Sequence, residues 1–447
     1  MIFPKITAFS GGSFNFFIMI EIYDWKTIGE KDRNRLMKRA QADMEPIKDT
    51  VALWLNRVRD EGDGAVLDYI RTFDDPNFSL DQLRVTEEDI RVAYERTDPK
   101  VLVMIRRQIE ISRAYHVVQA SKITREWEIE SVPGVRTGVR VVPIDAVGLY
   151  VPAGKAPLPT VAQILTVAAK AAGVPRAVVC FAPTAPNYEI IVAANEAGAN
   201  EIYRVGGIAA IGALTYGTET IQPVYKICGP GNPYVQAAKL QVFGTVGIDM
   251  LSGPSEALIL ADESADPRYV AADILARCEH GPDSAGVVAT SSRSLANQVR
   301  LEVERQAPLL ARQEYVGEAL RAYSAILVFD SDEAVIDFAN EYSAEHLEIQ
   351  MKDPWVILPQ IRNAGSVFLG DYAPVAVGDY ASGTNHCLPT GVAAKFASPV
   401  CVQTFLKEME YQFLTREGLE NLRPIVEAIS DVEGLDAHKR SVQIRFE

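Results

Sequence analysis

Residues 157–183 read PLPTVAQILTVAAKAAGVPRAVVCFAP, and this stretch indicates the fold class. Its first part has the apolar spacing of a helix, and Gly173 and Pro175 are typical of a helix end. The second part, RAVVCFAP, is a short apolar run that predicts a buried strand. Residues 187–207 repeat this order in NYEIIVAANEAGANEIYRVGG. Helices alternating with apolar strands predict crossover units around a parallel sheet, so we expect one α/β unit over residues 147–254.

The same alternation continues further along the chain. Apolar runs predict strands over residues 256–262, 285–291, 325–330 and 365–370, and helical spacing predicts helices over 267–280, 294–306 and 331–343. A second α/β unit therefore spans about 255–400. Residues 20–130 and the tail from 401 are helical in period. We expect two open, mostly parallel α/β units of incomplete Rossmann-like type, with helical N- and C-terminal pieces.

Composition narrows the class of protein. The net charge of −15 disfavours nucleic acid and anionic membrane surfaces as partners. Five cysteines without a CxxC pair fit reduced, buried thiols in a cytoplasmic protein, and no run is long enough to span a membrane. The first eighteen residues make a poor signal peptide, and Met19 opens an ordinary amphipathic stretch. We interpret residues 1–18 as a disordered extension or an upstream mis-start.

Polar islands between the apolar segments suggest where chemistry could occur. Neither the dinucleotide fingerprint nor the phosphate-binding loop is present in standard form, although glycine-rich turns follow several predicted strands. Four of the five histidines lie in such islands, in CEHGPDS, SAEHLE, GTNHC and LDAHK. The adjacent Glu345 and His346 suit a general acid/base pair. His280, Asp379 and His438 offer nitrogen and oxygen donors of the kind that bind zinc.

Eight blocks together resemble the histidinol dehydrogenase family. They are VGLYVPAGKAPLPT, YGTETI, GPGNPYV, FGTVGIDMLSGPSEALILAD, CEHGPDS, SAEHLE, GDYASGTNHCLPTG and EGLDAHKRSV, and the resemblance runs from about residue 40 to 447. It implies oxidation of L-histidinol through histidinaldehyde to L-histidine with two NAD, by a zinc-dependent homodimer whose subunits share each active site.

The resemblance also implies roles for individual residues and segments. His346 would take the alcohol proton, and Glu345 would activate the water that attacks the aldehyde. His280, Asp379 and His438 would hold zinc; Ser255, Tyr380, His386 and Glu433 would line the substrate pocket; Tyr150 and Asn232 would contact NAD. The implied domains are a small helical domain (19–41 and 401–427), a main catalytic α/β domain (42–146 and 255–400), an NAD-binding α/β domain (147–254) and a C-terminal segment for the partner's site (428–447).

Two positions depart from the family pattern. Ala209 replaces a Gln that touches the cofactor, a loss of about 1 kcal/mol. Arg277 replaces a Gln that ligates zinc, one helical turn before His280, and a guanidinium has no lone pair to donate to a metal. Three arrangements follow: zinc stays on three ligands with Arg277 turned aside, Arg277 pairs with Asp379 in a metal-free site, or Arg277 binds an anionic group of the substrate.

These departures leave three functions open. The first is oxidation of histidinol itself, which the otherwise intact pocket positions favour. The second is oxidation of another polar alcohol by a paralogue, such as a sulfonated propanediol, because a forked Arg suits carboxylate, sulfonate or phosphate. The third is a catalytically idle, ligand-binding homologue, against which the intact Glu345 and His346 argue.

Overall fold

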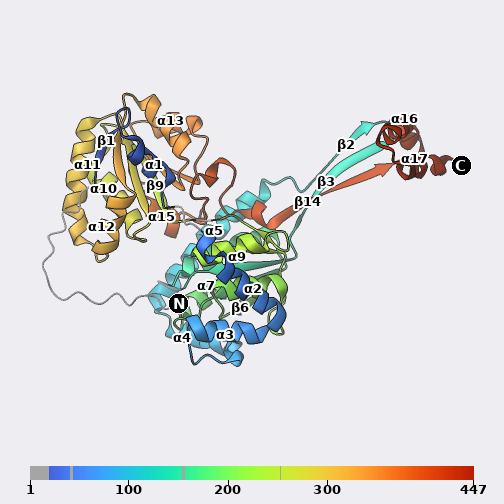
Figure 1. Ribbon diagram of the computed structural model, residues 1–447, viewed down its shortest axis with the longest axis horizontal. Coiled ribbons are helices and arrows are strands. Elements are labelled where there is room, and N and C mark those ends of the chain that lie inside the picture. The colour runs from blue at the N-terminus through green and yellow to red at the C-terminus, as the bar shows by residue number, and fades with distance from the viewer. Residues whose placement is uncertain (1–19, 41–43, 154–156, 252) are drawn as a thin grey trace. The chain divides into compact units, whose positions relative to one another are not determined.

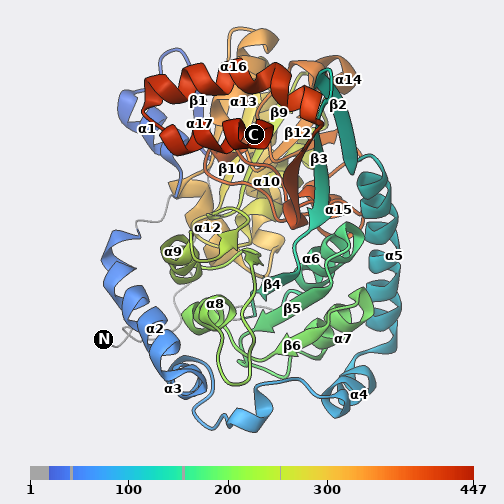
Figure 2. The same cartoon turned by 90° about the vertical axis from the view of Figure 1, so that its right-hand side faces the viewer.

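The computed structural model describes residues 20–40, 44–153, 157–251 and 253–447 (Figures 1 and 2). The chain forms two compact units. Unit 1 contains the segment up to Pro46, Met250–Tyr380 and His386–Pro399, and unit 2 contains Ile47–Asp249, Ala381–Asn385 and Val400–Glu447. The expected extension over residues 1–18 lies outside the described residues.

Unit 1 is built on a six-stranded parallel sheet with the order β1-β11-β10-β9-β12-β13. Its strands are β1 (Ile22–Asp24), β9 (Glu256–Ala261), β10 (Ala285–Thr290), β11 (Ala325–Val328), β12 (His346–Gln350) and β13 (Ser366–Leu369). The central strands are buried on both faces, which explains why the sequence shows continuous apolar runs there rather than alternation. This confirms the predicted parallel α/β architecture.

Helices cover both faces of this sheet. On one face α10 (Pro267–Cys278), α11 (Arg293–Gln306) and α12 (Gln313–Ala322) pack on a core that includes Ile259, Val288 and Ile326. On the other face α1 (Glu30–Lys38) and α13 (Asp332–Tyr342) pack on a core that includes Leu258 and Val287. The short α14 (Pro354–Ile357) and α15 (Val375–Tyr380) precede and follow β13. Alternate residues of β9 and β12 therefore face different helix layers.

Unit 2 contains a five-stranded parallel sheet with the order β6-β5-β4-β7-β8. The strands are β4 (Ala146–Val151), β5 (Arg176–Phe181), β6 (Glu201–Tyr203), β7 (Lys226–Cys228) and β8 (Gly247–Ile248). The helices are α2 (Lys48–Glu61), α3 (Asp63–Phe73), α4 (Glu87–Arg96), α5 (Pro99–Ser121), α6 (Pro159–Ala172), α7 (Tyr188–Ala197), α8 (Gly207–Tyr216) and α9 (Pro233–Val242). Figure 2 shows α6 and α7 on one side of this sheet and α8 and α9 on the other.

Unit 2 also contains an antiparallel sheet, which was not predicted. The predictions that residues 20–130 and the tail from 401 are helical are therefore wrong where this sheet forms. It has the order β14-β3-β2, with β2 (Glu126–Val132), β3 (Val135–Pro143) and β14 (Leu406–Leu414). The helices of the tail, α16 (Arg416–Glu433) and α17 (Asp436–Gln443), begin only after β14. The strands β2 and β14 are mostly exposed, so their charged sequences carry no buried-strand signal. The three-residue β1 is too short to give a periodic pattern.

The compact units divide the chain differently from the expected domains. Residues 47–146 belong to unit 2 with the 147–249 segment, not to a catalytic domain with 255–400. Likewise 20–40 belongs to unit 1 and 400–427 to unit 2, rather than to one helical domain. The reason is packing: α2 packs on α8 and α9, and α5 packs on α6 and α7. The functional roles given to these segments stay predictions.

The five cysteines are thiols that take part in no disulfide, as the sequence predicts, and four of them are buried. Among the described residues, none of the helices combines the length and apolar character that a membrane crossing requires.

Candidate active site

The candidate site of unit 1 lies where β12 begins. Strands β9 and β12 are parallel neighbours, with His346 opposite Ala257. The sheet grows from β9 through β10 to β11 on one side and through β12 to β13 on the other, so the order reverses between β9 and β12. Ligands of open α/β sheets usually bind at such a reversal, outside the carboxyl ends of the strands. Here Glu345 and His346 stand at the amino ends instead.

His346 is arranged as a base. It is 2% exposed, and its Nδ1 lies 3.1 Å from the carbonyl oxygen of Glu256. A carbonyl only accepts, so Nδ1 donates and the lone pair of the neutral ring is on Nε2, which lies 3.5 Å from Asp379 Oδ1. Burial and the Arg277 charge lower the pKa of His346, but the Glu345 carboxylate and the contact with Asp379 outweigh them and raise it. Asp379 thus stabilises the protonated ring.

Glu345 is held by a reciprocal pair of hydrogen bonds with Glu256. Glu345 N donates to Glu256 Oε1 at 3.1 Å, and Glu256 N donates to Glu345 Oε2 at 2.9 Å. Gly365 allows this placement, because a Cβ there would lie 2.4 Å from the Glu345 carbonyl oxygen. The Glu345 carboxylate also lies 3.4 Å from His346 Nδ1. Both predicted acid/base residues are therefore fixed by β9, the neighbouring strand.

Arg39 is a second positioning residue, and the sequence analysis missed it. Its Nη1 donates to both carboxylate oxygens of Glu256, at 2.7 and 2.8 Å, and its guanidinium lies 3.7 Å from the ring centroid of Tyr342. Burial raises the pKa of Glu256 to about 7 against the opposing Arg39 charge. A signal for Glu256 was present, since it is a charged residue that opens the apolar run EALILAD.

Arg277 points at the carboxylate expected to bind the metal. It lies on α10 with 4% of its side chain exposed, and Nη2 donates to Asp379 Oδ2 at 3.4 Å. Its Nε has no hydrogen-bond partner among the described residues. Burial would raise the pKa of Asp379, but the contact with His346 and the Arg277 charge hold it well below its ordinary value. Of the three arrangements considered above, this contact corresponds to the pairing of Arg277 with Asp379.

A buried polar layer continues from this pair along the same face of β12. Gln350 Nε2 donates to Asp273 Oδ2 at 2.7 Å and to Glu348 Oε2 at 3.0 Å. Burial raises the pKa of both carboxyls, that of Glu348 well above its ordinary value. Asp273 lies one turn before Arg277 on α10. The guanidinium therefore also faces a layer of acids whose burial favours their protonated forms.

The other predicted residues of unit 1 lie on adjacent segments. Ser255 directly precedes β9, Tyr380 ends α15 and is exposed, and His280 follows α10. The surrounding protein and Arg277 lower the pKa of His280, although part of its ring faces solvent. Burial lowers the pKa of His386, which also hydrogen-bonds to the Asp379 backbone. Three histidines thus gather around one carboxylate.

The donors of unit 1 do not fit a divalent metal. No group of three or more His, Cys, Asp or Glu with metal-binding geometry occurs in the described part of the chain. Asp379 is already in contact with a guanidinium. At roughly 4 Å and an effective dielectric of about 20, that guanidinium would repel a divalent ion by about 8 kcal/mol. At the position where the resemblance implies a zinc ligand, this chain therefore has the positive charge of Arg277, which would repel zinc.

The predicted cofactor residues lie in unit 2, at the strand-order reversal between β4 and β7. Tyr150 is near the carboxyl end of β4, is 5% exposed, and accepts a hydrogen bond from Gly207 N at 3.2 Å. Asn232 follows β7, and its Oδ1 caps α9 through Val235 N at 3.1 Å. A Cβ at Gly229 would lie 2.2 Å from the Tyr150 carbonyl oxygen, so both sides of this crevice approach closely. This reversal, at the carboxyl ends of the strands, is the place where open α/β sheets usually bind a ligand.

Three further predicted residues lie in unit 2. Ala209 is fully buried on α8, where it presents no polar group. Glu433 ends α16 and His438 lies on α17, both exposed and both in unit 2.

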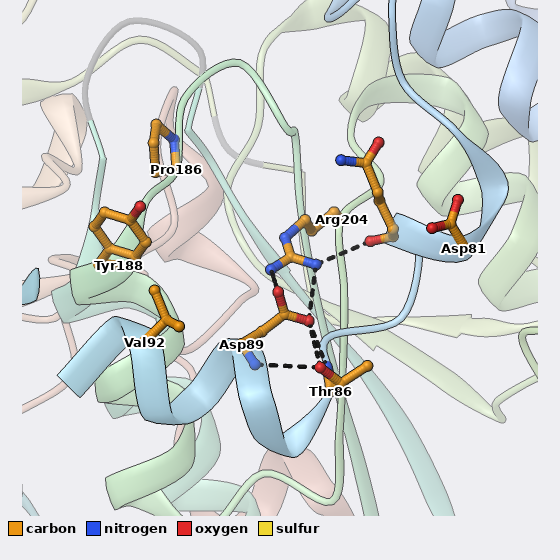
Figure 3. A pocket seen from close by; sticks show the side chains of 8 residues that line it. Asp81, Thr86, Asp89, Val92, Pro186, Tyr188 and Arg204 are labelled. Carbon is orange, nitrogen blue, oxygen red and sulfur yellow. Dashed lines mark hydrogen bonds and ion pairs between the residues drawn. The ribbon is translucent and has the colours of Figure 1, made fainter. Parts of the chain in front are cut away.

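A pocket on unit 2 has a structural explanation (Figure 3). Arg204 pairs with Asp89 at 2.8 Å and donates to the Gln82 carbonyl at 2.9 Å. Asp89 and Thr86 form the capping box of α4. These polar groups satisfy one another, so the pocket shows a helix start and its anchor rather than a reactive centre.

Comparisons with known proteins agree with the sequence motifs. A family model described as histidinol dehydrogenase matches residues 37–446. Histidinol dehydrogenases of Methanosarcina mazei and Methanothermobacter thermautotrophicus are each 42% identical, over 94% and 95% of this chain and 96% and 98% of theirs. The crystal structure of histidinol dehydrogenase from Elizabethkingia anophelis matches with a TM-score of 0.89 and 35% identity, over 96% of this chain and 98% of that one.

Proposed function

Because the chain belongs to the histidinol dehydrogenase family, we propose that it is an NAD-dependent dehydrogenase that oxidises L-histidinol through histidinaldehyde to L-histidine. The observation that carries this proposal is the ring orientation of His346. Its Nδ1 is committed to the Glu256 carbonyl, and its Nε2 is the free base, with an acid beside it to stabilise the charge that proton uptake creates.

The proposed chemistry has two oxidations. His346 Nε2 removes the hydroxyl proton while a hydride leaves the carbinol carbon, which produces the aldehyde. Glu345 then takes a proton from water as the water oxygen adds to the aldehyde carbon, and His346 returns its proton to the aldehyde oxygen, which gives the hydrate. The neutral His346 then removes a hydrate proton as the second hydride leaves. Bound NAD supplies the hydride acceptor in each oxidation, and Tyr150 and Asn232 are the proposed contacts for it.

One observation favours a second candidate substrate. Within the described part of the chain, Arg277 makes a single long hydrogen bond and its Nε has no partner. Such a fork suits an alcohol that carries a carboxylate, sulfonate or phosphate, such as a sulfonated propanediol. The Asp379 carboxylate already lies beside the guanidinium, and for this reason histidinol remains the first substrate.

We also propose a homodimer in a cytoplasmic setting. The residues Ile425, Ile429 and Val432 form an apolar stripe on α16 and are 61%, 52% and 84% exposed. The sheet next to it exposes six of the seven residues of β2. An isolated sheet with open faces needs a partner for stability, and a second copy whose site receives Glu433 and His438 would provide one.

NADH yield per L-histidinol tests this function. We expect about two NADH per substrate for the unchanged chain, none for His346→Asn, and about one for Glu345→Gln, because only the second oxidation needs the activated water. Glu341→Gln, an exposed change on α13, is the matched control and should match the unchanged chain. Absence of NADH with histidinol and with sulfonated and carboxylated alcohols would contradict the proposal.

A further inference from the structure

The position of Arg277 bears on whether this site uses a metal. The side chain is 4% exposed and comes from α10, which packs directly on the sheet. Its Nε is enclosed and has no partner among the residues that the structure describes, so the stem as well as the head of the side chain is buried. Turning the guanidinium aside to admit an ion would require opening the packed layer between α10 and β12. Arg277 is therefore a fixed part of the site.

Asp379 links this fixed cation to the proposed base. One carboxylate oxygen lies 3.4 Å from Arg277 Nη2 and the other lies 3.5 Å from His346 Nε2. A carboxylate bound to a metal could bridge a cation and a base in the same way. In this chain the cation comes from the polypeptide.

We propose that Arg277 takes the place of a divalent metal, so that this dehydrogenase site works without one. The guanidinium holds Asp379 toward His346, and its unpaired donors bind an acceptor atom of the substrate, as a metal would bind a lone pair. The inference builds on the proposed dehydrogenase function, but the exclusion of metal can be measured without turnover.

Metal content of the whole purified protein is the first test. After dialysis against micromolar zinc, we expect fewer than about 0.1 zinc per unchanged chain and about one per chain of Arg277→Gln. Arg277→Gln combined with Asp379→Asn should lose this gain, and Arg277→Lys, which keeps the charge, should stay metal-free. Arg268→Gln is the matched control, an exposed arginine on the same helix. Cobalt(II) absorbance and circular dichroism report the ligand field and the fold of each variant.

Sensitivity of the activity to a chelator is the second test of the inference. NADH production by the unchanged chain should be insensitive to a strong chelator. About one tightly held zinc per unchanged chain, removed together with activity by chelation, would overturn the inference, and so would an Arg277→Gln variant that folds but stays metal-free. An unchanged chain that is metal-free and turns over no alcohol would contradict the proposed function while leaving metal exclusion by Arg277 standing.

Discussion

At the scale of single residues, Arg39 holds the proposed catalytic residue Glu345 in place through Glu256. Its fork binds Glu256, and Glu256 holds Glu345. The Arg39 and Glu256 side chains are 4% and 3% exposed, so removing the cation would leave a buried carboxylate without its partner. We expect Arg39→Met to lower the free energy of unfolding by about 3–5 kcal/mol, measured by urea denaturation.

The matched control for this change is Arg33→Met on α1, the helix that Arg39 directly follows. The Arg33 guanidinium is exposed and lies 4.3 Å from the ring centroid of Trp25, an arrangement that contributes up to about 1 kcal/mol. If Arg39→Met were no more destabilising than Arg33→Met, the buried pair would not anchor the site.

A buried acid in unit 2 gives a pH-dependent prediction. Burial raises the pKa of Asp74 to about 6, and its Oδ2 has no partner among the described residues. Between about pH 4 and pH 6 the folded protein keeps a proton that the unfolded chain has lost, so the free energy of unfolding falls as pH rises through this window. We expect Asp74→Asn to flatten this fall and to stabilise the protein by about 1–3 kcal/mol at pH 7.

Urea denaturation between pH 4.5 and 7.5 measures this effect, with Asp81→Asn, an exposed change, as the control. A pH dependence that persists in Asp74→Asn would assign it to another group.

The residues predicted from sequence and those missed differ in a physical way. Glu345, His346 and Arg277 belong to local polar motifs at element ends, which a single sequence displays. The Arg39 contact joins the residue that follows α1 to β9 across 217 positions of sequence. No local pattern reports such a contact, because the partners meet only when the sheet of unit 1 assembles.

At the scale of elements, Asn232 combines two roles that can be separated. Its side chain caps α9, and its amide is proposed to contact NAD. Asn232→Ala should lose about 1 kcal/mol of unfolding free energy, and Asn232→Ser should keep the cap. Both variants lose the amide, so both should raise KM for NAD by about 3- to 10-fold. A KM that rises only in Asn232→Ala would assign the effect to the cap.

The strands show the same division between what a sequence displays and what it does not. The strands β5, β9 and β10 are buried on both faces and appear as apolar runs, so they were predicted. In contrast, β2 and β14 are exposed and charged, and their conformation depends on pairing with β3 across distant sequence. Strand pairing, rather than local propensity, determines these elements.

At the scale of the whole molecule, the exposed stripe of α16 and the position of Glu433 lead to a test of shared sites. In the proposed dimer, each site combines Glu345 and His346 of one subunit with Glu433 of the other. A Glu345→Gln, His346→Asn chain and a Glu433→Ala chain should each be inactive alone. In a mixed dimer, one site carries all the changes and the other carries none. Random pairing makes half of the dimers mixed, so co-expression should restore about a quarter of the activity.

Sedimentation velocity of the same samples gives the assembly state, expected at twice the 49.0 kDa chain. Val432→Asp should produce monomers by placing a charge in the apolar contact, whereas Leu309→Asp, at an equally exposed apolar position of unit 1, should not. Dimers without restored activity in the mixed sample would mean that each subunit completes its own site. Restored activity would instead mean that the C-terminal helices act across the interface, and the exposed stripe on α16 would then be the surface that carries Glu433 to its partner.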